Sequence, residues 1–350
     1  MVRTDNLRIE RFSPLTPPDA IKAELPLTAR AADTVVMARA GLENILSQRD
    51  RRLIAIVGPC SIHSREDAVE YATRLRRLAR ELERQLLVVM RVYFEKPRTM
   101  LGWKGLIYDP AMNDTCDIET GLRLARRILL EINELGVPAG AEILEPVVPQ
   151  YFTDLVSWAA IGARTAESQT HRQMASGLSM PIGFKNSTDG SMKVAVDAIR
   201  TAASPHTFIG VTGDGRVATF RTCGNRFGHL VLRGGYEGPN YTSEHLAFAQ
   251  ELLRQSGVAP NLMVDCSHAN SGKDPQRQMA VLREVLAQIR GGTGIIRGIM
   301  LESHLLGGRQ EIPVGGKPQA GLSVTDACLG WDDTERLLRE AAAVVAEVAT

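Results

Sequence analysis

Eight short apolar runs of this chain each lead into a residue that can bind a phosphate, a carboxylate or a metal. Amphipathic stretches separate the runs, and this alternation is typical of parallel strands joined by helices. Right-handed crossovers place the carboxyl ends of all such strands on one side. When eight strands close into a barrel, that side is the polar mouth where active sites lie. The runs lead into Cys60, Arg91, Glu142, Arg164, Lys185, Arg233, His268 and Glu302.

The alternation predicts an α/β fold, a (β/α)8 TIM barrel over residues 51–350. The first fifty residues stand outside the pattern. Prolines 14, 17, 18 and 26 predict an irregular arm, and apolar residues at helical spacing predict a helix over 28–48. We therefore divide the chain into an N-terminal regulatory arm and helix, 1–50, and a catalytic barrel, 51–350.

One segment inside the barrel breaks the alternation of strands and helices. Residues 206–211 and 216–222 are two β-type runs around the turn sequence Thr-Gly-Asp-Gly. They predict a β-hairpin over about 206–222, inserted between helix 5 and strand 6 of the barrel. An insertion with its own turn usually serves an interface or an effector site.

Composition restricts the partners of the chain. Lys and Arg number 41 against 40 Asp and Glu, so no basic field favours nucleic acid. No run approaches the roughly 18 apolar residues that span a bilayer, and the first residues are not those of a signal peptide. Five cysteines without framework spacing fit a reduced protein. We expect small-molecule partners, no nucleic acid, no membrane and a cytoplasmic location.

Basic residues gather at the predicted mouth. The planar fork of arginine suits phosphate and carboxylate groups, and lysine adds a point charge. Each of these residues taken alone also fits a surface cation paired with a helix carboxylate. Their convergence at one mouth instead indicates substrates that carry several negative charges. The set comprises Arg91, Lys96, Arg98, Arg164, Lys185 and Arg233.

A second set of residues suits a metal. Cys60, His268 and Glu302 follow strands one, seven and eight, which are neighbours in a closed barrel. Together with Asp326 they offer sulfur, nitrogen and oxygen ligands, which favour a divalent transition metal such as Mn, Fe, Co or Zn. The alternative is a buried cysteine, a core histidine and two surface acids.

Seven motifs at these positions resemble the type I 3-deoxy-D-arabino-heptulosonate-7-phosphate (DAHP) synthases. The resemblance runs from the N-terminal arm to the last helix. Tyr108 and Ser187 stand where the family is expected to have Asn and Gly, and neither position carries chemistry. The motifs are GPCSIH at 58–63, MRVYFEKPRT at 90–99, GARTAES at 162–168, GFKN at 183–186, LRGG at 232–235, DCSHAN at 265–270 and SVTDAC at 323–328.

The resemblance implies a transferase of the shikimate pathway. Its members condense phosphoenolpyruvate with erythrose 4-phosphate and water, giving DAHP and phosphate. A metal on the four ligands would polarise the sugar aldehyde. Carried over by motif, Arg164, Lys185 and Arg233 would hold the phosphoenolpyruvate phosphate, Arg91, Lys96 and Lys185 its carboxylate, and Arg98 and Thr99 the sugar phosphate. The catalytic residues would be Lys96 and Glu142, as candidates for proton handling, together with the metal ligand His268.

Two other functions remain open at this point. One is the sister enzyme that uses arabinose 5-phosphate, 3-deoxy-manno-octulosonate-8-phosphate synthase, whose members lack the arm and the hairpin. The other is a non-catalytic, effector-binding barrel. A complete metal set argues against it, because a pure binding module does not need a redox-sensitive thiolate ligand.

The resemblance further implies feedback inhibition by an aromatic amino acid, with tyrosine as the expected effector. Gly210 replaces the serine of phenylalanine-sensitive relatives and would leave room for the tyrosine hydroxyl. Tryptophan is the rival effector, and a glycine needed only by the hairpin backbone is the alternative explanation. Family members form homo-oligomers, so we expect a dimer or a tetramer in which the arm reaches a neighbour. The matching effector positions are Asp5, Asn6, Pro149, Gln150, Leu178, Ser179, Phe208, Gly210 and Val211.

Overall fold

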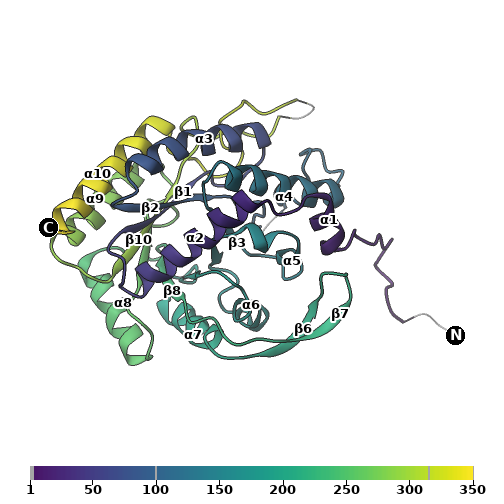
Figure 1. Cartoon of the computed structure of the whole chain (residues 1–350), viewed down its shortest axis with the longest axis horizontal. Helices are drawn as coiled ribbons and strands as arrows, with labels where there is room; N and C mark the ends of the chain where they lie inside the picture. The colour runs from purple at the N-terminus through teal and green to yellow at the C-terminus, as the bar shows by residue number, and fades with distance from the viewer. Residues whose placement is uncertain (1–3, 99–100, 314–315, 350) are drawn as a thin grey trace.

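A closed parallel barrel of eight strands forms the centre of the computed structural model, which describes residues 4–98, 101–313 and 316–349 (Figure 1). Neighbouring strands follow one another in chain order around the barrel, apart from the two hairpin strands. The predicted TIM barrel is therefore confirmed. Its strands are β1 Leu53–Gly58, β2 Leu86–Arg91, β3 Ala139–Glu142, β4 Trp158–Ile161, β5 Ile182–Lys185, β8 Gly228–Leu232, β9 Leu262–Asp265 and β10 Ile296–Glu302.

Helices cover the outside of the barrel. Their starts follow capping rules: the Ser64 side chain accepts the backbone N–H of Asp67, and the Asp117 side chain accepts that of Thr120. Acidic residues in the first turn add a favourable interaction with the helix dipole. The helices that follow the strands are α3 Arg65–Glu81, α4 Ile118–Glu134, α5 Pro149–Phe152 with the 3-10 turn Thr153–Leu155, α6 Gln169–Ala175, α7 Met192–Ala202, α8 Ser243–Gln255, α9 Arg277–Arg290 and α10 Trp331–Ala349.

Helix α2, Ala29–Leu46, closes the end of the barrel opposite the mouth. Its Leu42 and Ile45 belong to the same buried cluster as the interior residues Ile54 and Trp158. The side chain of Asn261, which precedes β9, donates to the carbonyl oxygen of Leu46 over 2.8 Å. The N-terminal segment is therefore joined to the barrel core through α2.

The arm contains one helix that the sequence pattern did not predict. Helix α1 covers Pro18–Glu24, where the prolines predicted irregular chain. Pro18 takes the first helical position, whose backbone N–H has no partner within a helix, so proline is tolerated there. The prediction of a wholly irregular arm was wrong for this reason.

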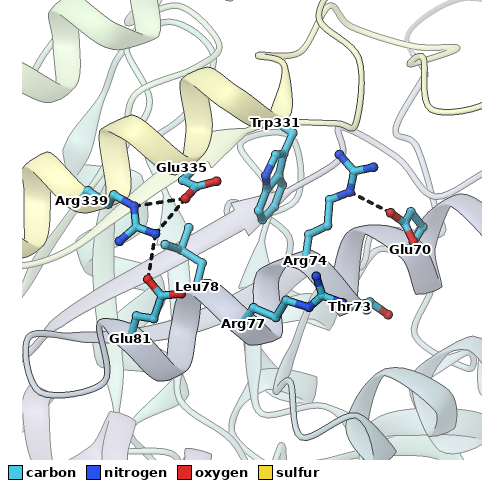
Figure 2. Close-up of a pocket in the computed structure, with 9 residues that line it drawn as sticks. All are labelled: Glu70, Thr73, Arg74, Arg77, Leu78, Glu81, Trp331, Glu335 and Arg339. Atoms are coloured by element: carbon cyan, nitrogen blue, oxygen red, sulfur yellow. Dashed lines mark hydrogen bonds and ion pairs between the residues drawn. The ribbon is translucent and has the colours of Figure 1, made fainter.

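The last helix packs against the first helix of the barrel. In the groove between α10 and α3, Arg339 forms ion pairs with Glu81 and Glu335 at 2.7 and 2.8 Å (Figure 2). Beneath them, Trp331 meets the ring of Tyr71 edge-on, with centroids 5.4 Å apart. These contacts join the two ends of the barrel sequence.

The predicted hairpin is present and lies outside the barrel. Strands β6 Thr207–Val211 and β7 Val217–Arg221 pair antiparallel between α7 and β8. Figure 1 shows them running past α6 and α7, with their turn near α1. At that turn, the backbone N–H of Asp19 donates to the carbonyl oxygen of Gly213 over 2.8 Å.

None of the helices in the described part of the chain is long and apolar enough to cross a membrane.

Candidate active site and effector cavity

The four predicted metal ligands meet at the barrel mouth. Ligand atoms of Cys60, Glu302 and Asp326 lie within 4.8 Å of one another. Nε2 of His268 lies 3.8 Å from Oε1 of Glu302. One thiol, one imidazole and two carboxylates thus converge, and this donor set fits a divalent transition metal.

Strand register explains why these residues meet. Strand β10 pairs with β1 on one side, where Glu302 lies opposite Gly58, and with β9 on the other, where Met300 lies opposite Asp265. Cys60 and His268 follow the two flanking strands by a few residues. The neighbourhood predicted from strand order is therefore observed.

Two of the predicted phosphoenolpyruvate-binding cations pair with the metal ligands. Arg91, with 1% of its surface exposed, donates from Nη2 to Oε1 of Glu302 over 2.9 Å. Nζ of Lys96 donates to the Cys60 sulfur over 2.9 Å. Charge-assisted contacts of this kind fix side-chain geometry in a buried site. The two predicted sets of residues consequently form one network.

One cavity of about 260 Å³ opens among these groups at the mouth. Arg98 and Arg164 are exposed at its rim, whereas Arg91 and Lys185 are buried at its base. Thr99 lies outside the described residues. The predicted site residues that line the cavity are Arg91, Lys96, Arg98, Glu142, Arg164, Lys185, Arg233, His268 and Asp326.

Glu142 lies among the buried cations of the mouth. Its Oε2 is 3.5 Å from Nζ of Lys185. Burial alone would raise the pKa of Glu142, but Lys185, Lys96 and Arg91 outweigh burial and lower it. Glu142 is therefore ionised at neutral pH.

Cys60 and Lys96 shift each other's protonation. Burial raises the pKa of the Cys60 thiol, and Glu302 adds to the effect. Burial lowers the pKa of Lys96, but Cys60, Glu302 and Asp326 outweigh burial and raise it. Lys96 thus remains a cation, while a metal must displace the thiol proton in order to bind Cys60.

The structure adds three residues that the sequence patterns did not select. The Tyr93 ring lies beneath Arg91, whose guanidinium carbon is 3.9 Å from the ring centroid. Nζ of Lys273 lies 3.7 Å from Oδ1 of Asp326 and lines the cavity. Asp265 ends β9 and is completely buried beside His268. Tyr93 and Asp265 stand inside two of the recognised motifs, which was the available signal.

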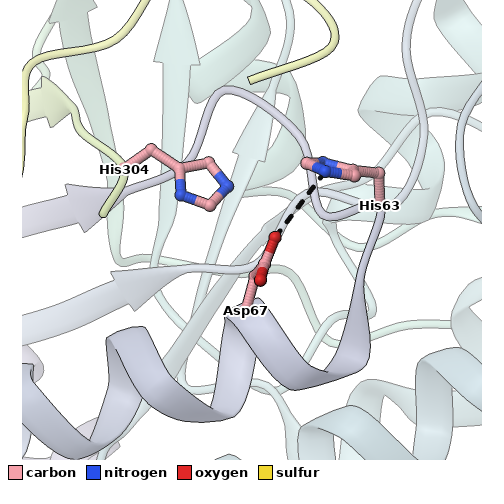
Figure 3. A group of neighbouring side chains, drawn as sticks. All are labelled: His63, Asp67 and His304. Carbon is pink, nitrogen blue, oxygen red and sulfur yellow. Dashed lines mark ion pairs between the residues drawn. The ribbon is translucent and has the colours of Figure 1, made fainter. Parts of the chain in front are cut away.

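A second group of titratable side chains lies beside the mouth. It comprises His63, Asp67 and His304, whose ligand atoms also lie within 4.8 Å of one another (Figure 3). Nδ1 of His304 accepts the backbone N–H of Leu305 over 2.8 Å, so the neutral ring carries its proton on Nε2.

Both histidines of this group are neutral, and two of its three side chains accept backbone N–H groups. Burial lowers the pKa of His304 to about 3 and also lowers that of His63, so both rings are neutral. Asp67 is held by the backbone N–H of Gly321, at 2.7 Å. The backbone N–H groups of Leu305 and Gly321 thus hold His304 and Asp67 in place.

The predicted effector residues line a second cavity, of about 530 Å³, between the hairpin and the barrel. This volume lies within the usual range for small-molecule sites. Asp5 and Asn6 do not line it within one chain; they lie in the arm, where Nδ2 of Asn6 donates to Asp5. The predicted residues that do line it are Pro149, Gln150, Leu178, Ser179, Phe208, Gly210 and Val211.

Phe220 controls the space at Gly210. It stacks on Phe208 with ring centroids 5.8 Å apart and also lines the cavity. A Cβ atom added at Gly210 would lie 2.9 Å from the Phe220 ring, closer than such contacts allow. Because Gly210 does not have a positive φ angle, the hairpin backbone does not require glycine. Glycine is required at this position by the nearby ring of Phe220.

Comparison with known proteins assigns the chain to a family. Residues 26–339 match the DAHP synthetase I family. A phenylalanine-sensitive phospho-2-dehydro-3-deoxyheptonate aldolase of Escherichia coli K12 is 51% identical over 98% of each chain. The chain belongs to the DAHP synthetase I family. A solved structure of a phospho-2-dehydro-3-deoxyheptonate aldolase from Francisella tularensis SCHU S4 superposes with a TM-score of 0.94 at 43% identity, covering 96% of this chain and 98% of that one.

Family membership confirms the predicted enzyme class. Phospho-2-dehydro-3-deoxyheptonate aldolase is another name for DAHP synthase, and the named relatives cover nearly the whole chain. The comparisons therefore favour DAHP synthase over the arabinose 5-phosphate enzyme and over a non-catalytic barrel.

Overall similarity to other DAHP synthetase I members does not select the effector. A tyrosine-sensitive relative from Salmonella typhimurium LT2 is 50% identical over 96% of this chain and 94% of its own length. A tryptophan-sensitive relative from Escherichia coli O157:H7 is 49% identical over 99% of each chain. These identities lie within two percentage points of the phenylalanine-sensitive relative, so overall identity does not distinguish the three sensitivities.

Proposed function

We propose that the mouth cavity condenses phosphoenolpyruvate with erythrose 4-phosphate. The observation that carries the proposal is the meeting of a transition-metal ligand set and the six predicted cations around one cavity. Two phosphates, a carboxylate and an aldehyde require both kinds of group. In the reaction, C3 of phosphoenolpyruvate bonds to the aldehyde carbon, water adds at C2, and phosphate leaves by cleavage of the C–O bond.

The depth of each cation in the mouth suggests how the substrates lie. Lys185 and Arg91 are buried at the base, so they suit phosphoenolpyruvate, with Arg164 and Arg233 completing its phosphate site. Arg98 is exposed at the rim, where its Nε donates to the carbonyl oxygen of Trp103 over 2.9 Å. The rim suits the sugar phosphate, and Thr99 would assist there. Phosphoenolpyruvate would thus occupy the inner position.

The donor set at the mouth fits Mn, Fe, Co or Zn, held by Cys60, His268, Glu302 and Asp326. A divalent metal bound there would supply Lewis-acid polarisation of the aldehyde. The residues themselves hold the reacting groups: Lys96 stays cationic beside Cys60, and Glu142 stays ionised among the cations. Both lie beside the cavity and are the residues proposed to handle protons there.

An assay of phosphoenolpyruvate consumption tests the proposed reaction. We expect release of one phosphate for each phosphoenolpyruvate consumed with erythrose 4-phosphate, and none without a sugar. A chelator should abolish the activity, and Mn²⁺ should restore it. Preference for arabinose 5-phosphate, or full activity after complete removal of metal, would contradict the proposal.

The second cavity is proposed to bind tyrosine as a feedback inhibitor. Phe208 and Phe220 offer aromatic faces to the effector ring, and Ser179 and Gln150 offer polar groups. A buried tyrosine hydroxyl without a partner would cost about 1 to 3 kcal/mol, so one of these groups or water must meet it. Inhibition titrations with tyrosine, phenylalanine and tryptophan test the assignment. Stronger inhibition by phenylalanine or tryptophan would overturn it.

The arm is proposed to reach a neighbouring copy in a homodimer or homotetramer. Its Leu7 and Phe12 are 67% and 70% exposed, which is unfavourable for apolar side chains unless a partner covers them. Asp5 and Asn6 would then join the effector cavity of that neighbour. Removal of residues 1–12 should reduce the oligomer measured by light scattering and should abolish inhibition. An unchanged oligomer with intact inhibition would contradict this role.

A further inference from the structure

A completely buried carboxylate lies between the metal ligands and the phosphate cations. Asp265 ends β9 with 0% of its surface exposed. Its Oδ2 is 2.8 Å from Nδ1 of His268 and 3.8 Å from Nζ of Lys185. Oδ2 accepts no aligned hydrogen bond from the described residues, so these two contacts balance its charge. A buried carboxylate in such a position needs a reason, because its desolvation is costly.

The other oxygen of Asp265 acts through Ser267. Oδ1 accepts the backbone N–H of Ser267 over 3.0 Å and its hydroxyl over 2.6 Å. The Ser267 hydroxyl also lies 2.7 Å from Nδ1 of His268. Since that hydroxyl gives its hydrogen to Asp265, it faces His268 with a lone pair. Nδ1 of His268 is therefore surrounded by acceptors and carries the ring proton.

This protonation leaves the lone pair of His268 on Nε2, which lies toward Glu302 in the metal group. A histidine that binds a metal usually donates its other N–H to a carboxylate or a carbonyl, and that contact fixes both tautomer and ring orientation. We propose that Asp265, directly and through Ser267, is the positioning residue that holds His268 ready for the metal. This inference rests on the metal site proposed above.

Asp265→Asn provides the sharpest test, because it changes the tautomer with little change in shape. The asparagine oxygen must take the Oδ1 position, where two donors from Ser267 point. Its NH₂ group then faces Nδ1 of His268 as a donor and forces the ring proton onto Nε2. We expect the Kd for Mn²⁺, measured by electron paramagnetic resonance of free Mn²⁺, to rise about 10- to 100-fold. Ser267→Ala removes only the indirect contact and should give a smaller rise.

A direct readout of the tautomer separates positioning from general structure. Nitrogen-15 spectra of histidine-labelled, metal-free protein should show His268 protonated at Nδ1 in the wild type and at Nε2 in Asp265→Asn. Asp154→Asn, which loses an ion pair with Arg126 (2.8 Å) outside the mouth, serves as the control and should keep the Mn²⁺ affinity. An unchanged tautomer or an unchanged Kd in Asp265→Asn would overturn the inference.

His268→Ala distinguishes this inference from the metal site itself. If His268→Ala weakens Mn²⁺ binding while Asp265→Asn does not, Asp265 has no positioning role and the metal site stands. If His268→Ala leaves the Mn²⁺ affinity unchanged, the proposed ligand set fails and the inference fails with it.

Discussion

The mouth and the hairpin cavity are lined by different kinds of side chain. The mouth consists of buried charges, such as Arg91 with Glu302 and Lys96 with Cys60, each held by a partner of complementary character. The hairpin cavity has aromatic and apolar walls on a two-stranded ribbon whose residues alternate between half-buried and exposed. Barrel strands hydrogen-bonded on both sides fix the mouth, whereas the hairpin strands pair only with each other.

This difference should separate the proposed chemistry of the mouth from the proposed regulation at the hairpin. A buried charge that loses its partner is costly, so substitutions in the mouth should abolish function. An apolar cavity on a two-stranded ribbon tolerates changes of shape, so substitutions there should alter which effector binds. We therefore expect large losses of activity from the mouth and changes of selectivity from the hairpin.

The largest effect should follow from Cys60→Ala. Loss of the thiolate removes one of four ligands, so Mn²⁺ affinity and turnover should each fall by about 100-fold or more. Cys116→Ala, at an exposed cysteine that lines neither cavity, is the matched control and should retain both. Equilibrium dialysis and steady-state assays measure the two quantities. A Cys60→Ala enzyme with normal metal affinity would mean that the mouth is not a thiolate metal site.

The pH dependence of stability should also trace to the mouth. Burial raises the pKa of Glu95 to about 8, from an ordinary value of 4.5. Between these values the folded protein keeps a proton that the unfolded chain releases, so the free energy of unfolding falls as pH rises. The fall amounts to about 1.4 kcal/mol for each pH unit and ends above pH 8. Glu95→Gln should abolish this fall, so the free energy of unfolding of the variant should exceed that of the wild type by a margin that grows from pH 5 to pH 8.

A carboxylate of the hairpin supplies the contrast for Glu95. The Thr212 hydroxyl lowers the pKa of Asp214, so any effect of Asp214 on stability lies at acidic pH. Urea denaturation of Asp214→Asn should therefore run parallel to the wild type from pH 5 to pH 8. A pH-dependent difference in the free energy of unfolding between Asp214→Asn and the wild type, or no such difference for Glu95→Gln, would contradict the contrast between the two regions.

Within the mouth, two arginines should separate the substrates. Arg164→Ala should weaken phosphoenolpyruvate binding, and Arg98→Ala should weaken erythrose 4-phosphate binding. Loss of a charge-assisted phosphate contact costs about 1.5 to 3 kcal/mol, which corresponds to a rise in KM of roughly 10- to 150-fold. Steady-state KM values for both substrates provide the measurement. Equal rises for both substrates in either variant would show that the division into base and rim is wrong.

The smallest effect should come from the hairpin. Because a side chain at position 210 meets the Phe220 ring, Gly210→Ser should change effector preference fully only when combined with Phe220→Ala. We expect the double variant to shift preference from tyrosine toward phenylalanine by about tenfold, while activity without effector is unchanged. Ile209→Ser, on the 79% exposed face of the same strand, is the control and should leave inhibition as it is. A shift of equal size in Ile209→Ser would argue against a role for the cavity.

Much of the mouth could be predicted because its residues follow strands. A strand that is buried on both faces appears in the sequence as a continuous apolar run, as in β1 and β2, and the residue after it enters the mouth. The type of each residue then indicates its ligand, as for Cys60 and Arg91. The hairpin could be predicted equally well, since two β-type runs flank a turn of glycine and aspartate.

Other features depend on contacts between distant residues. Nothing in the local pattern of residues 29–46 showed that Leu42 and Ile45 would close the barrel floor, because any amphipathic helix has an apolar face. Phe220 lies ten residues beyond Gly210, and only pairing of β6 with β7 brings the ring over the glycine. The role of Asp265 emerges from its distances to His268 and Lys185.

The sequence by itself determined the eight strands, the inserted hairpin and the kinds of chemical group carried at the strand ends. These features follow from local periodicity and residue type, which act over a few neighbours in the chain. The tertiary structure decided which charges face each other, which tautomer of His268 is favoured and how much space remains at Gly210. Those properties depend on distances of a few ångströms between residues far apart in sequence, and only packing in the closed barrel sets such distances.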